Sequence, residues 1–424
     1  MNVLICFISL LTTATFAFTQ EAEWGDWEED REQRLRWHGF VEGAWGSRWD
    51  RDPNLDGKRT LGDTRLRIET DWTGERFAVS FKGDLLYDEV AGEFDALVRD
   101  LSLAVSPAET LDLKLGRQVL TWGTGDLLFL NDLFPKDWVS FFAGREDEYL
   151  KAPADAIRLT FYNSVANIDF VWSPEFEPDN YLTGERFSFF SPQTGKRIAP
   201  DPPLHAHEPK HAVHNGELAL RVFKNVDSIE YALYGYRGYF KQPSAVTDDF
   251  TPTFAPMSAV GASLRRPLGA GLLNAEVAYY HSRDDEHGED GQTANSQVRL
   301  LTGYEREVVK NFTLGVQYYL EWTQDHDALL ANSPQPAFEP DKYRHLLTSR
   351  LTYRAYRDKL TLSLFTFLSP SDEDYYLRPQ MTYRYSDQWL FTWGASLFGG
   401  EAEHTFFGQF EDNSNTYLKV RFNY

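Results

Sequence analysis

The chain is short of cysteine, methionine and positive charge. Its 424 residues contain one Cys and three Met, and 42 Lys and Arg stand against 64 Asp and Glu, a formal net charge of -22 at pH 7. A phosphate backbone would be repelled by this charge, which argues against nucleic acid as a partner. The single cysteine is Cys6, so the chain after it can form no disulfide and offers no thiol nucleophile.

Long apolar runs are absent beyond the first residues. Residues 1–11 are mostly apolar and small residues follow to Ala17, which predicts a signal peptide over residues 1–17. This leader lacks Lys and Arg, and Cys6 leaves a lipoprotein as the alternative. Residues 18–34 are predicted to form an acidic N-terminal periplasmic segment. No later run approaches the roughly 18 apolar residues of a membrane helix, so any membrane location must come from strands.

Apolar and polar residues alternate through much of the remaining chain. In residues 312–322 one face carries Phe312, Leu314, Val316, Tyr318, Leu320 and Trp322, and the other carries Thr313, Gly315, Gln317, Tyr319 and Glu321. Residues 63–72 and 389–397 repeat the pattern. A period of two predicts β-strands with one apolar and one polar face.

We predict about eighteen such strands, each near the 9 to 11 residues that a tilted membrane strand requires. They begin near Leu35, Arg65, Phe77, Ala96, Leu111, Ala154, Val165, Glu217, Ser228, Met257, Gly271, Gln297, Phe312, His345, Leu360, Tyr375, Trp389 and Thr416. Short connections such as 73–76 alternate strictly with mostly longer polar ones such as 173–214. This rhythm predicts one rim of short periplasmic turns and one of long extracellular loops.

Backbone hydrogen bonding decides how strands can cross a membrane. Hydrocarbon offers no partner for unpaired N–H and C=O groups, so a spanning sheet must close on itself. We therefore predict an all-β fold, a single closed antiparallel transmembrane β-barrel over residues 35–424 in the outer membrane of a Gram-negative cell. A soluble all-β protein, such as a propeller or a stack of sandwiches, is the alternative.

The last predicted strand ends on an aromatic residue, with Leu418, Val420, Phe422 and Tyr424 on one face. This pattern is similar to the C-terminal signal by which outer-membrane barrels are recognised for insertion. The expected partners are therefore outer-membrane lipid and lipopolysaccharide, the barrel-assembly machinery and a solute. The pattern leaves the oligomeric state open.

Residues 113–126 contain the motif Gly116-Arg117-Gln118 followed by Trp122-Gly123. This stretch resembles a strand of the alginate-export family and related proteobacterial outer-membrane porins. The resemblance covers about a tenth of the chain and implies a porin-like barrel that passes an anionic or otherwise polar solute. Trp122 stands where alginate exporters carry Tyr, which leaves the solute in doubt.

If the apolar face of each strand contacts lipid, the polar face lines a pore. The predicted pore-lining residues are Arg65, Arg67, Lys82, Lys114, Arg117, Arg158, Arg221, Arg299, Glu305, Glu321, Arg350, Arg354, Arg378, Arg384 and Arg421. Arg117 joins this set on the hypothesis that a bulge at Gly116 turns it inward. Clustered arginines would favour anions, and the alternative is a wall of mutually paired charges without selectivity.

The connection between the predicted fifth and sixth strands, residues 123–153, is too apolar to extend freely into water. We predict that it is inserted into the barrel and narrows the pore through Leu127, Phe129, Phe134, Trp138 and Phe142. Passage of a hydrophobic or aromatic compound is the alternative.

The sequence suggests a structural Ca²⁺ ion as a cofactor, and zinc at His205, His207, His211 and His214 is a weaker alternative. Asp52, Asn54 and Asp56 match the first half of a calcium loop, with Asp63 in the place of its bidentate ligand. Hairpin loops are rich in these residue types for conformational reasons alone, which is the competing explanation.

Three classes of function remain. The favoured one is an outer-membrane channel for passive passage of polar, anionic solutes or a polysaccharide. An outer-membrane enzyme is not expected, because the chain has no Gly-x-Ser-x-Gly motif. A barrel that sheathes a partner or serves as an adhesin is the remaining alternative.

Overall fold

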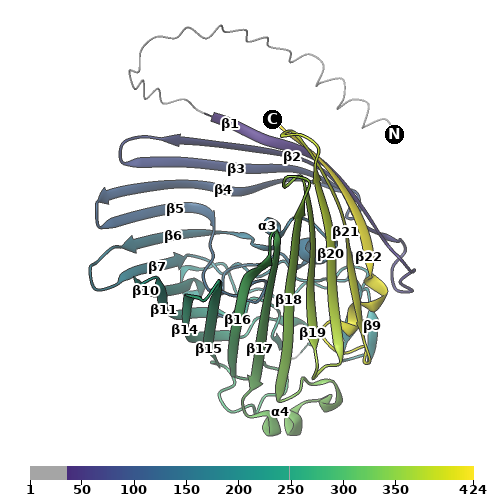
Figure 1. Cartoon of the computed structure of the whole chain (residues 1–424). Coiled ribbons are helices and arrows are strands. Elements are labelled where there is room, and N and C mark those ends of the chain that lie inside the picture. Colours follow the sequence, from purple (N-terminus) through teal and green to yellow (C-terminus); the bar gives the residue numbers. More distant parts are fainter. Residues whose placement is uncertain (1–35, 248) are drawn as a thin grey trace, which may run out of the picture. The chain divides into compact units, whose positions relative to one another are not determined.

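Eighteen strands form one closed antiparallel sheet. The computed structural model describes residues 36–247 and 249–424. Each barrel strand pairs with the next one along the chain, and β1 pairs with β22 to close the ring (Figure 1). The barrel strands are β1 (Arg36–Arg48), β2 (Arg59–Thr73), β3 (Phe77–Asp88), β4 (Glu93–Ala108), β5 (Leu111–Val119), β6 (Pro153–Phe161), β7 (Asn167–Ser173), β10 (Glu217–Val226), β11 (Ile229–Tyr239), β14 (Pro256–Leu268), β15 (Gly271–Ser282), β16 (Gln297–Val309), β17 (Phe312–Thr323), β18 (Tyr343–Ala355), β19 (Leu360–Ser369), β20 (Asp374–Arg384), β21 (Trp389–Gly400) and β22 (Asn415–Asn423).

The predicted closed barrel of eighteen strands is confirmed, whereas the signal peptide and the segment 18–34 lie outside the described residues. The largest error in a strand start is at β2, which begins at Arg59 and not near Arg65. Thr60, Leu61, Gly62 and Asp63 are all buried. Because all four residues are buried and apolar and polar residues do not alternate among them, the pattern that reveals a strand is lost.

The connections differ in length between the two rims. One rim has tight connections such as 109–110 and 269–270, whereas the other carries long ones such as 174–216. The strict alternation that we expected is wrong at two places, because residues 89–92 and 370–373 on the long-loop rim are also short turns. The tight turn before β17 places Asn311 at φ 64°, a conformation that Asn tolerates better than most residues.

The long loops contain the remaining small elements. These are α2 (Trp138–Ala143), α3 (Asp147–Leu150), α4 (His326–Asn332), the 3-10 helices η1 (Val213–Asn215), η2 (Pro336–Phe338) and η3 (Gly408–Asn413), and the two-stranded pairs β8 (Phe189–Ser191) with β9 (Lys196–Ile198) and β12 (Ala245–Val246) with β13 (Pro252–Thr253). Among the described residues, no helix is long and apolar enough to span a membrane.

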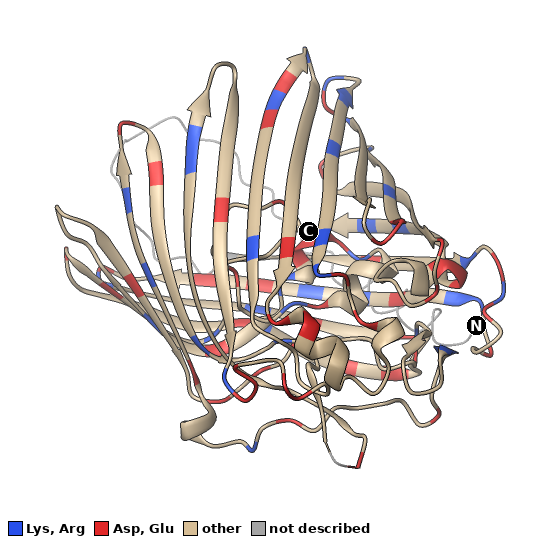
Figure 2. Cartoon of the chain, turned by 90° about the horizontal axis from the view of Figure 1, so that it is seen from below, with Lys and Arg blue, Asp and Glu red and all other residues tan. Residues whose placement is uncertain are grey.

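The two faces of the barrel wall differ in polarity as the alternation predicted. In β17, Val316 and Tyr318 are 46% and 38% exposed on the outer face, whereas Tyr319 is 5% exposed on the inner face. In β22, Leu418 and Val420 face outward and Lys419 is buried inside. Figure 2 shows acidic and basic residues interleaved along the strands. The outer face is therefore an apolar surface suited to lipid, and the charges line the interior.

A hydrophobic core lies inside the barrel. It joins inward-facing wall residues such as Tyr376 and Phe398, whose rings stack at 4.3 Å, to Leu130, Phe141 and Phe142 of the connection between β5 and β6. A wide barrel leaves room for such a filling, because its strands alone cannot fill the interior with side chains. The barrel interior is thus the place to look for function.

Candidate functional site: the charged interior of the barrel

Residues 120–152, the connection between β5 and β6, form a segment inserted into the barrel. Its first part contacts wall strands far away in the ring. The carboxylate of Glu276 in β15 accepts hydrogen bonds from the backbone N–H groups of Thr124 and Gly125. The amide of Gln317 in β17 exchanges two hydrogen bonds with the backbone of Asp126, at 2.7 and 2.8 Å. We call residues 120–152 the inserted segment.

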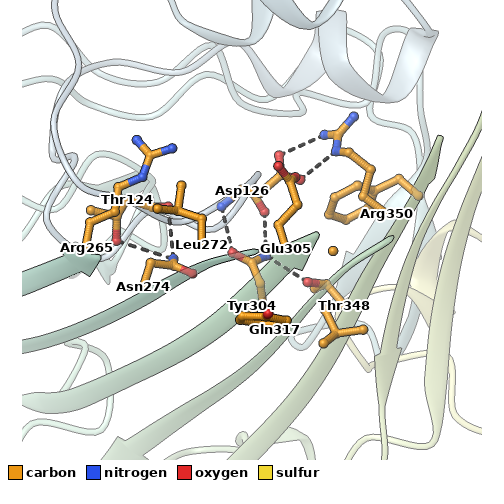
Figure 3. Close-up of a pocket in the computed structure, with 13 residues that line it drawn as sticks. Thr124, Asp126, Arg265, Leu272, Asn274, Tyr304, Glu305, Gln317, Thr348 and Arg350 are labelled. Carbon is orange, nitrogen blue, oxygen red and sulfur yellow. Dashed lines mark hydrogen bonds and ion pairs between the residues drawn. The ribbon is translucent and has the colours of Figure 1, made fainter. Parts of the chain in front are cut away.

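The carboxylate of Asp126 also meets the strand next to β17 in the wall. Arg350 in β18 donates to it through Nε at 2.5 Å and Nη2 at 2.8 Å, a bidentate pair (Figure 3). A cavity of about 120 Å³ lies beside this pair, and Arg265, Asn274 and Glu305 also line it. Polar groups therefore surround the space left next to the inserted segment.

Helix α2 sets the path of the inserted segment. The side chain of Asp137 caps its first turn by accepting from the N–H of Ser140 at 2.8 Å. Gly144 ends the helix at φ 85°, a left-handed conformation that glycine adopts without strain. A Cβ at Gly144 would also collide with the ring of Tyr417 in β22. After this turn the chain presents four charged residues, Arg145 to Glu148, to the wall.

The three acidic residues of this run each contact a different wall cation. Glu146 accepts from Lys419 in β22 at 2.6 Å, and Asp147 accepts from Arg378 in β20 at 2.9 Å. Glu148 accepts from Arg67 in β2 at 3.2 Å. We call Glu146, Asp147 and Glu148 the acidic run. It joins three strands of the wall through one short stretch of the inserted segment.

Glu146 and Asp147 stay ionised because of the cations beside them. Burial alone would raise the pKa of Glu146, but the charge and hydrogen bond of Lys419 together with the charge of Arg421 outweigh burial and hold the pKa below its ordinary value. Burial likewise opposes ionisation of Asp147, and Arg378 and Arg350 together lower its pKa. Both carboxylates are therefore charged at neutral pH.

Arg145 attaches the inserted segment to strands β2 and β3. Its guanidinium donates to Asp63 in β2 at 2.7 and 3.0 Å and to Asp88 in β3 at 2.8 Å. Arg186, from the connection between β7 and β10, also contacts Asp88. Two separate loops are thus held against the same two strands by buried ion pairs.

A second buried cluster surrounds Tyr149 of α3. Asp84 in β3 contacts both Arg65 and Arg67, with Arg65 at 2.7 Å and Arg67 Nη2 at 2.9 Å. The guanidinium carbons of Arg65 and Arg99 lie 4.2 and 4.8 Å from the centre of the Tyr149 ring. Cation–π contact and hydrogen bonding together lock α3 to the wall.

The structure places all the predicted pore-lining residues on the inner face except Arg117. Arg117 pairs in register with Leu101 and Asp155, which are exposed on the outer face, and it donates to Asp155 at 3.2 Å. The hypothesis that Gly116 turns it inward is wrong. Gly116 has a φ of 110° and lies against the backbone of Leu101, but the strand keeps its alternation through it.

Most of the predicted pore-lining cations are already paired. Among the described residues, ion-pair partners lie beside every one of them except Arg354 and Arg384, which are both exposed. Glu321 pairs with Arg299 at 3.3 Å, while Glu305 borders the cavity next to Asp126. The interior is therefore closer to a wall of mutually paired charges than to a cluster of unpaired arginines.

Sequence reasoning missed Arg99 and the acidic run. Arg99 sits at a bulge in β4, where Lys82 pairs with Asp100 and Gly83 with Val98, so the extra residue turns inward. It donates to the backbone carbonyls of Glu148 and Lys151, both at 2.9 Å. No local sequence signal marks this bulge. The acidic run, by contrast, interrupts an apolar stretch and could have been noticed as an isolated group of charges.

The predicted narrowing residues lie inside the barrel but differ in environment. Phe134 and Phe142 are buried in the core, and Trp138 donates its indole N–H to Asp179 at 2.8 Å. Phe129 and Leu127 are half-buried and border a cavity of about 420 Å³. Their role in narrowing a pore stays a prediction.

The four predicted calcium ligands do not form a cluster. Asp52 is buried and accepts from the backbone N–H of Asn54 at 2.8 Å and from the hydroxyl of Ser188. Asp63 lies in β2 and is engaged by Arg145, and Asp56 stays in the connection between β1 and β2. In the described part of the chain no three His, Cys, Asp or Glu side chains are grouped to hold a metal ion.

A closed ring of eighteen strands with an apolar exterior and a charged interior defines a transmembrane β-barrel of the outer-membrane type. Solved structures of the same fold include OccK5 (OpdH) of Pseudomonas aeruginosa, with a TM-score of 0.54, 10% identity and coverage of 92% of this chain and 97% of that chain. OccAB3 of Acinetobacter baumannii has a TM-score of 0.53 at 11% identity, covering 92% and 99%. OccK11 (OpdR) of Pseudomonas aeruginosa has the same TM-score, 0.53, at 10% identity, covering 92% and 95%.

These likenesses identify the fold alone. No family model matches the sequence, and no curated protein matches it either. The resemblance to alginate exporters therefore stays a resemblance.

Proposed function

We propose that the chain is an outer-membrane channel through which small polar solutes pass, with a weak preference for anions. The observation that carries this proposal is the acidic run, which the inserted segment holds against Lys419, Arg378 and Arg67 inside a closed barrel. Charges lining an enclosed space keep that space wet and favour polar solutes over apolar ones.

The inserted segment also bears on solute size. It reaches from β15 to β22 across the interior, and helices α2 and α3 fill part of the lumen. A polysaccharide chain would need a continuous wide passage, so a small solute suits this interior better. The runner-up, a hydrophobic or aromatic compound, is favoured by the apolar border of the 420 Å³ cavity.

The preference of the channel for anions over cations depends on three arginines. Arg265, Arg354 and Arg384 lie on the inner face, and among the described residues none of them forms an ion pair, although Glu230 stands opposite Arg265 in the neighbouring strand. The other cations are compensated by nearby carboxylates, so the excess positive field is small. A fixed guanidinium next to the solute path attracts anions, which gives the weak preference.

Single-channel recording in planar bilayers tests the proposal. Removal of residues 127–142 should raise the conductance, because it takes most of the apolar filling out of the lumen. Unchanged conductance would rule out a narrowing role for the inserted segment. A purified wild-type protein that inserts but never conducts would contradict the channel itself.

Reversal potentials in a KCl gradient test whether the channel prefers anions to cations. Replacing Arg265, Arg354 and Arg384 together by Gln should shift the reversal potential toward cation preference. Arg266→Gln is the matched control, because Arg266 is equally exposed but lies on the outer face. Equal shifts for both proteins would show that these three side chains do not set the selectivity.

A further inference from the structure

The 420 Å³ cavity is bordered by aromatic rings from several parts of the chain, together with aliphatic and charged side chains. Phe129, Trp138 and Phe142 come from the inserted segment, Tyr319 and Phe367 from β17 and β19, and Phe406 from the connection between β21 and β22. We call this cavity the aromatic chamber. A second cavity of about 310 Å³ shares Trp138, Phe142 and Phe406 with it. A cavity of this size, lined by aromatic rings and a limited number of polar side chains, is typical of a small-molecule site.

Several rings that border the chamber pack against one another edge to face. Phe129 and Trp138 meet at 6.2 Å with planes at 70°, and Phe406 and Phe407 meet at 4.9 Å with planes at 87°. Aromatic pairs prefer such edge-to-face arrangements, so a further ring placed between these walls would find favourable partners.

The two lysines that border the chamber have no N–H group left to donate a hydrogen bond to a solute. Lys136 Nζ donates to one carboxylate oxygen of Asp132 at 3.0 Å and to two backbone carbonyl oxygens at 2.7 and 3.3 Å. Lys241 Nζ donates to both carboxylate oxygens of Glu217, at 2.6 and 2.7 Å, and to a backbone carbonyl oxygen at 2.9 Å. An ammonium group has three donors, so both are saturated.

The two arginines of the chamber each pair with a carboxylate, and in the described part of the chain Nη2 of Arg344 is buried without a hydrogen-bond partner. Arg299 pairs with Glu321 at 3.3 Å and stacks 4.2 Å from the ring centre of Tyr280. Arg344 pairs with Asp372 at 2.7 Å and lies 4.9 Å from the ring centre of Phe406. An anion would have to compete with these carboxylates, whereas a neutral solute leaves every pair intact.

We infer that the aromatic chamber binds a neutral aromatic solute on its passage through the barrel. The ring lies among Phe129, Trp138 and Phe406, and the polar part of the solute remains in the wet part of the lumen. This inference rests on the proposed channel for the solute's route, and it adds a solute class that the excess of wall cations alone would not suggest.

Calorimetric titration of the purified full chain in detergent tests binding without requiring conduction. The probes are phenyl β-D-glucoside, methyl β-D-glucoside and phenyl β-D-glucuronide. The methyl glucoside lacks the aromatic ring, and the glucuronide adds a negative charge. We expect phenyl glucoside to bind more tightly than the other two. Equal binding of methyl glucoside, or tighter binding of phenyl glucuronide, would overturn the inference.

Two substitutions locate the binding. Phe406→Ala and Phe129→Ala should each weaken phenyl glucoside binding about 3- to 10-fold, the loss expected for one aromatic contact. Phe391→Ala is the matched control, because Phe391 is exposed on the outer face of β21. Unchanged binding in both chamber variants would place the solute elsewhere and overturn the inference.

Conductance measured on the same preparations separates the two proposals. A protein that conducts ions but binds no phenyl glucoside would refute the chamber and leave the channel. A protein that binds the glucoside but does not conduct would refute the channel and leave the binding site.

Discussion

Asp84 shows how much can depend on one wall residue. Its carboxylate is fully buried and serves both Arg65 and Arg67, which are 2% and 1% exposed. Those arginines in turn contact Tyr149 and Glu148 of the inserted segment. A buried charge that loses its partner is far more costly than an exposed one. Asp84 therefore stabilises both the wall and the attachment of α3.

We predict that Asp84→Asn lowers the free energy of unfolding by about 3 kcal/mol, because it leaves two buried guanidinium groups short of negative charge. Urea unfolding in lipid vesicles measures this loss. Asp100→Asn is the control: Asp100 pairs with the half-exposed Lys114, and a change below about 1 kcal/mol is expected there. Similar losses in the two variants would refute the special role of Asp84.

At the scale of elements, the inserted segment is held by ion pairs on two sides. Arg145 fastens it to β2 and β3, and the acidic run fastens it to β20, β22 and β2. Helix α3 is only four residues long and could not hold its position without these contacts. The position of the segment should therefore respond to the charge of its carboxylates.

The response to pH follows from the lowered pKa values of Glu146 and Asp147. A lowered pKa in the folded protein means that the ion pairs stabilise above the ordinary carboxyl range, near pH 4, and are lost as pH falls through the lowered value. We expect a constant single-channel conductance from about pH 8 to pH 5 and a rise below about pH 4, as the inserted segment loosens.

Two variants check that these carboxylates cause the transition. Glu146→Gln should conduct more than the wild type at neutral pH and show a smaller acid transition, because one ion pair with Lys419 is already absent. Glu208→Gln, in an exposed loop, should behave like the wild type. An acid transition of wild-type size in Glu146→Gln would refute this explanation.

For the whole molecule, the apolar outer face decides where the barrel can reside. Val316 lies near the middle of β17 and is exposed on the outside, whereas Val308 lies near the end of β16, next to the short turn. The cost of placing a cation against lipid depends on depth and is greatest at the middle of the bilayer.

We predict that Val316→Arg lowers the stability of the inserted barrel by about 2 to 4 kcal/mol and Val308→Arg by at most about 1 kcal/mol. Unfolding titrations in vesicles of defined lipid compare the two proteins. Equal effects of the two substitutions would argue against a lipid-facing position for the middle of β17.

Much of the barrel could be predicted because strand periodicity is a local property. The face assignments of β17 and β22 follow directly from alternation, since a residue and its second neighbour share a face. The start of β2 could not be placed in this way, because residues 60–63 are all buried and show no alternation of apolar and polar side chains. Arg99 was missed for a related reason: one extra residue in β4 reverses the alternation locally.

The candidate site was predictable in its residue types and not in its pairings. Alternation assigns Arg67, Arg378 and Arg421 to the interior, yet it cannot say which carboxylate each one meets. Their partners come from strands and loops up to hundreds of positions apart, as in the Arg378–Asp147 contact. Arg117 illustrates the limit, because a glycine beside it suggested an inward turn that the hydrogen-bonded register of β5 does not allow.

The amino-acid sequence by itself determined the number of strands, their faces and the apolar exterior, because each depends on residues one or two positions apart. Only the tertiary structure decided which wall strands residues 120–152 contact, that the acidic run meets Lys419, Arg378 and Arg67, and that most wall cations are neutralised. Ion pairs and cavities depend on distances between residues remote in the chain, and closing the ring between β1 and β22 sets those distances.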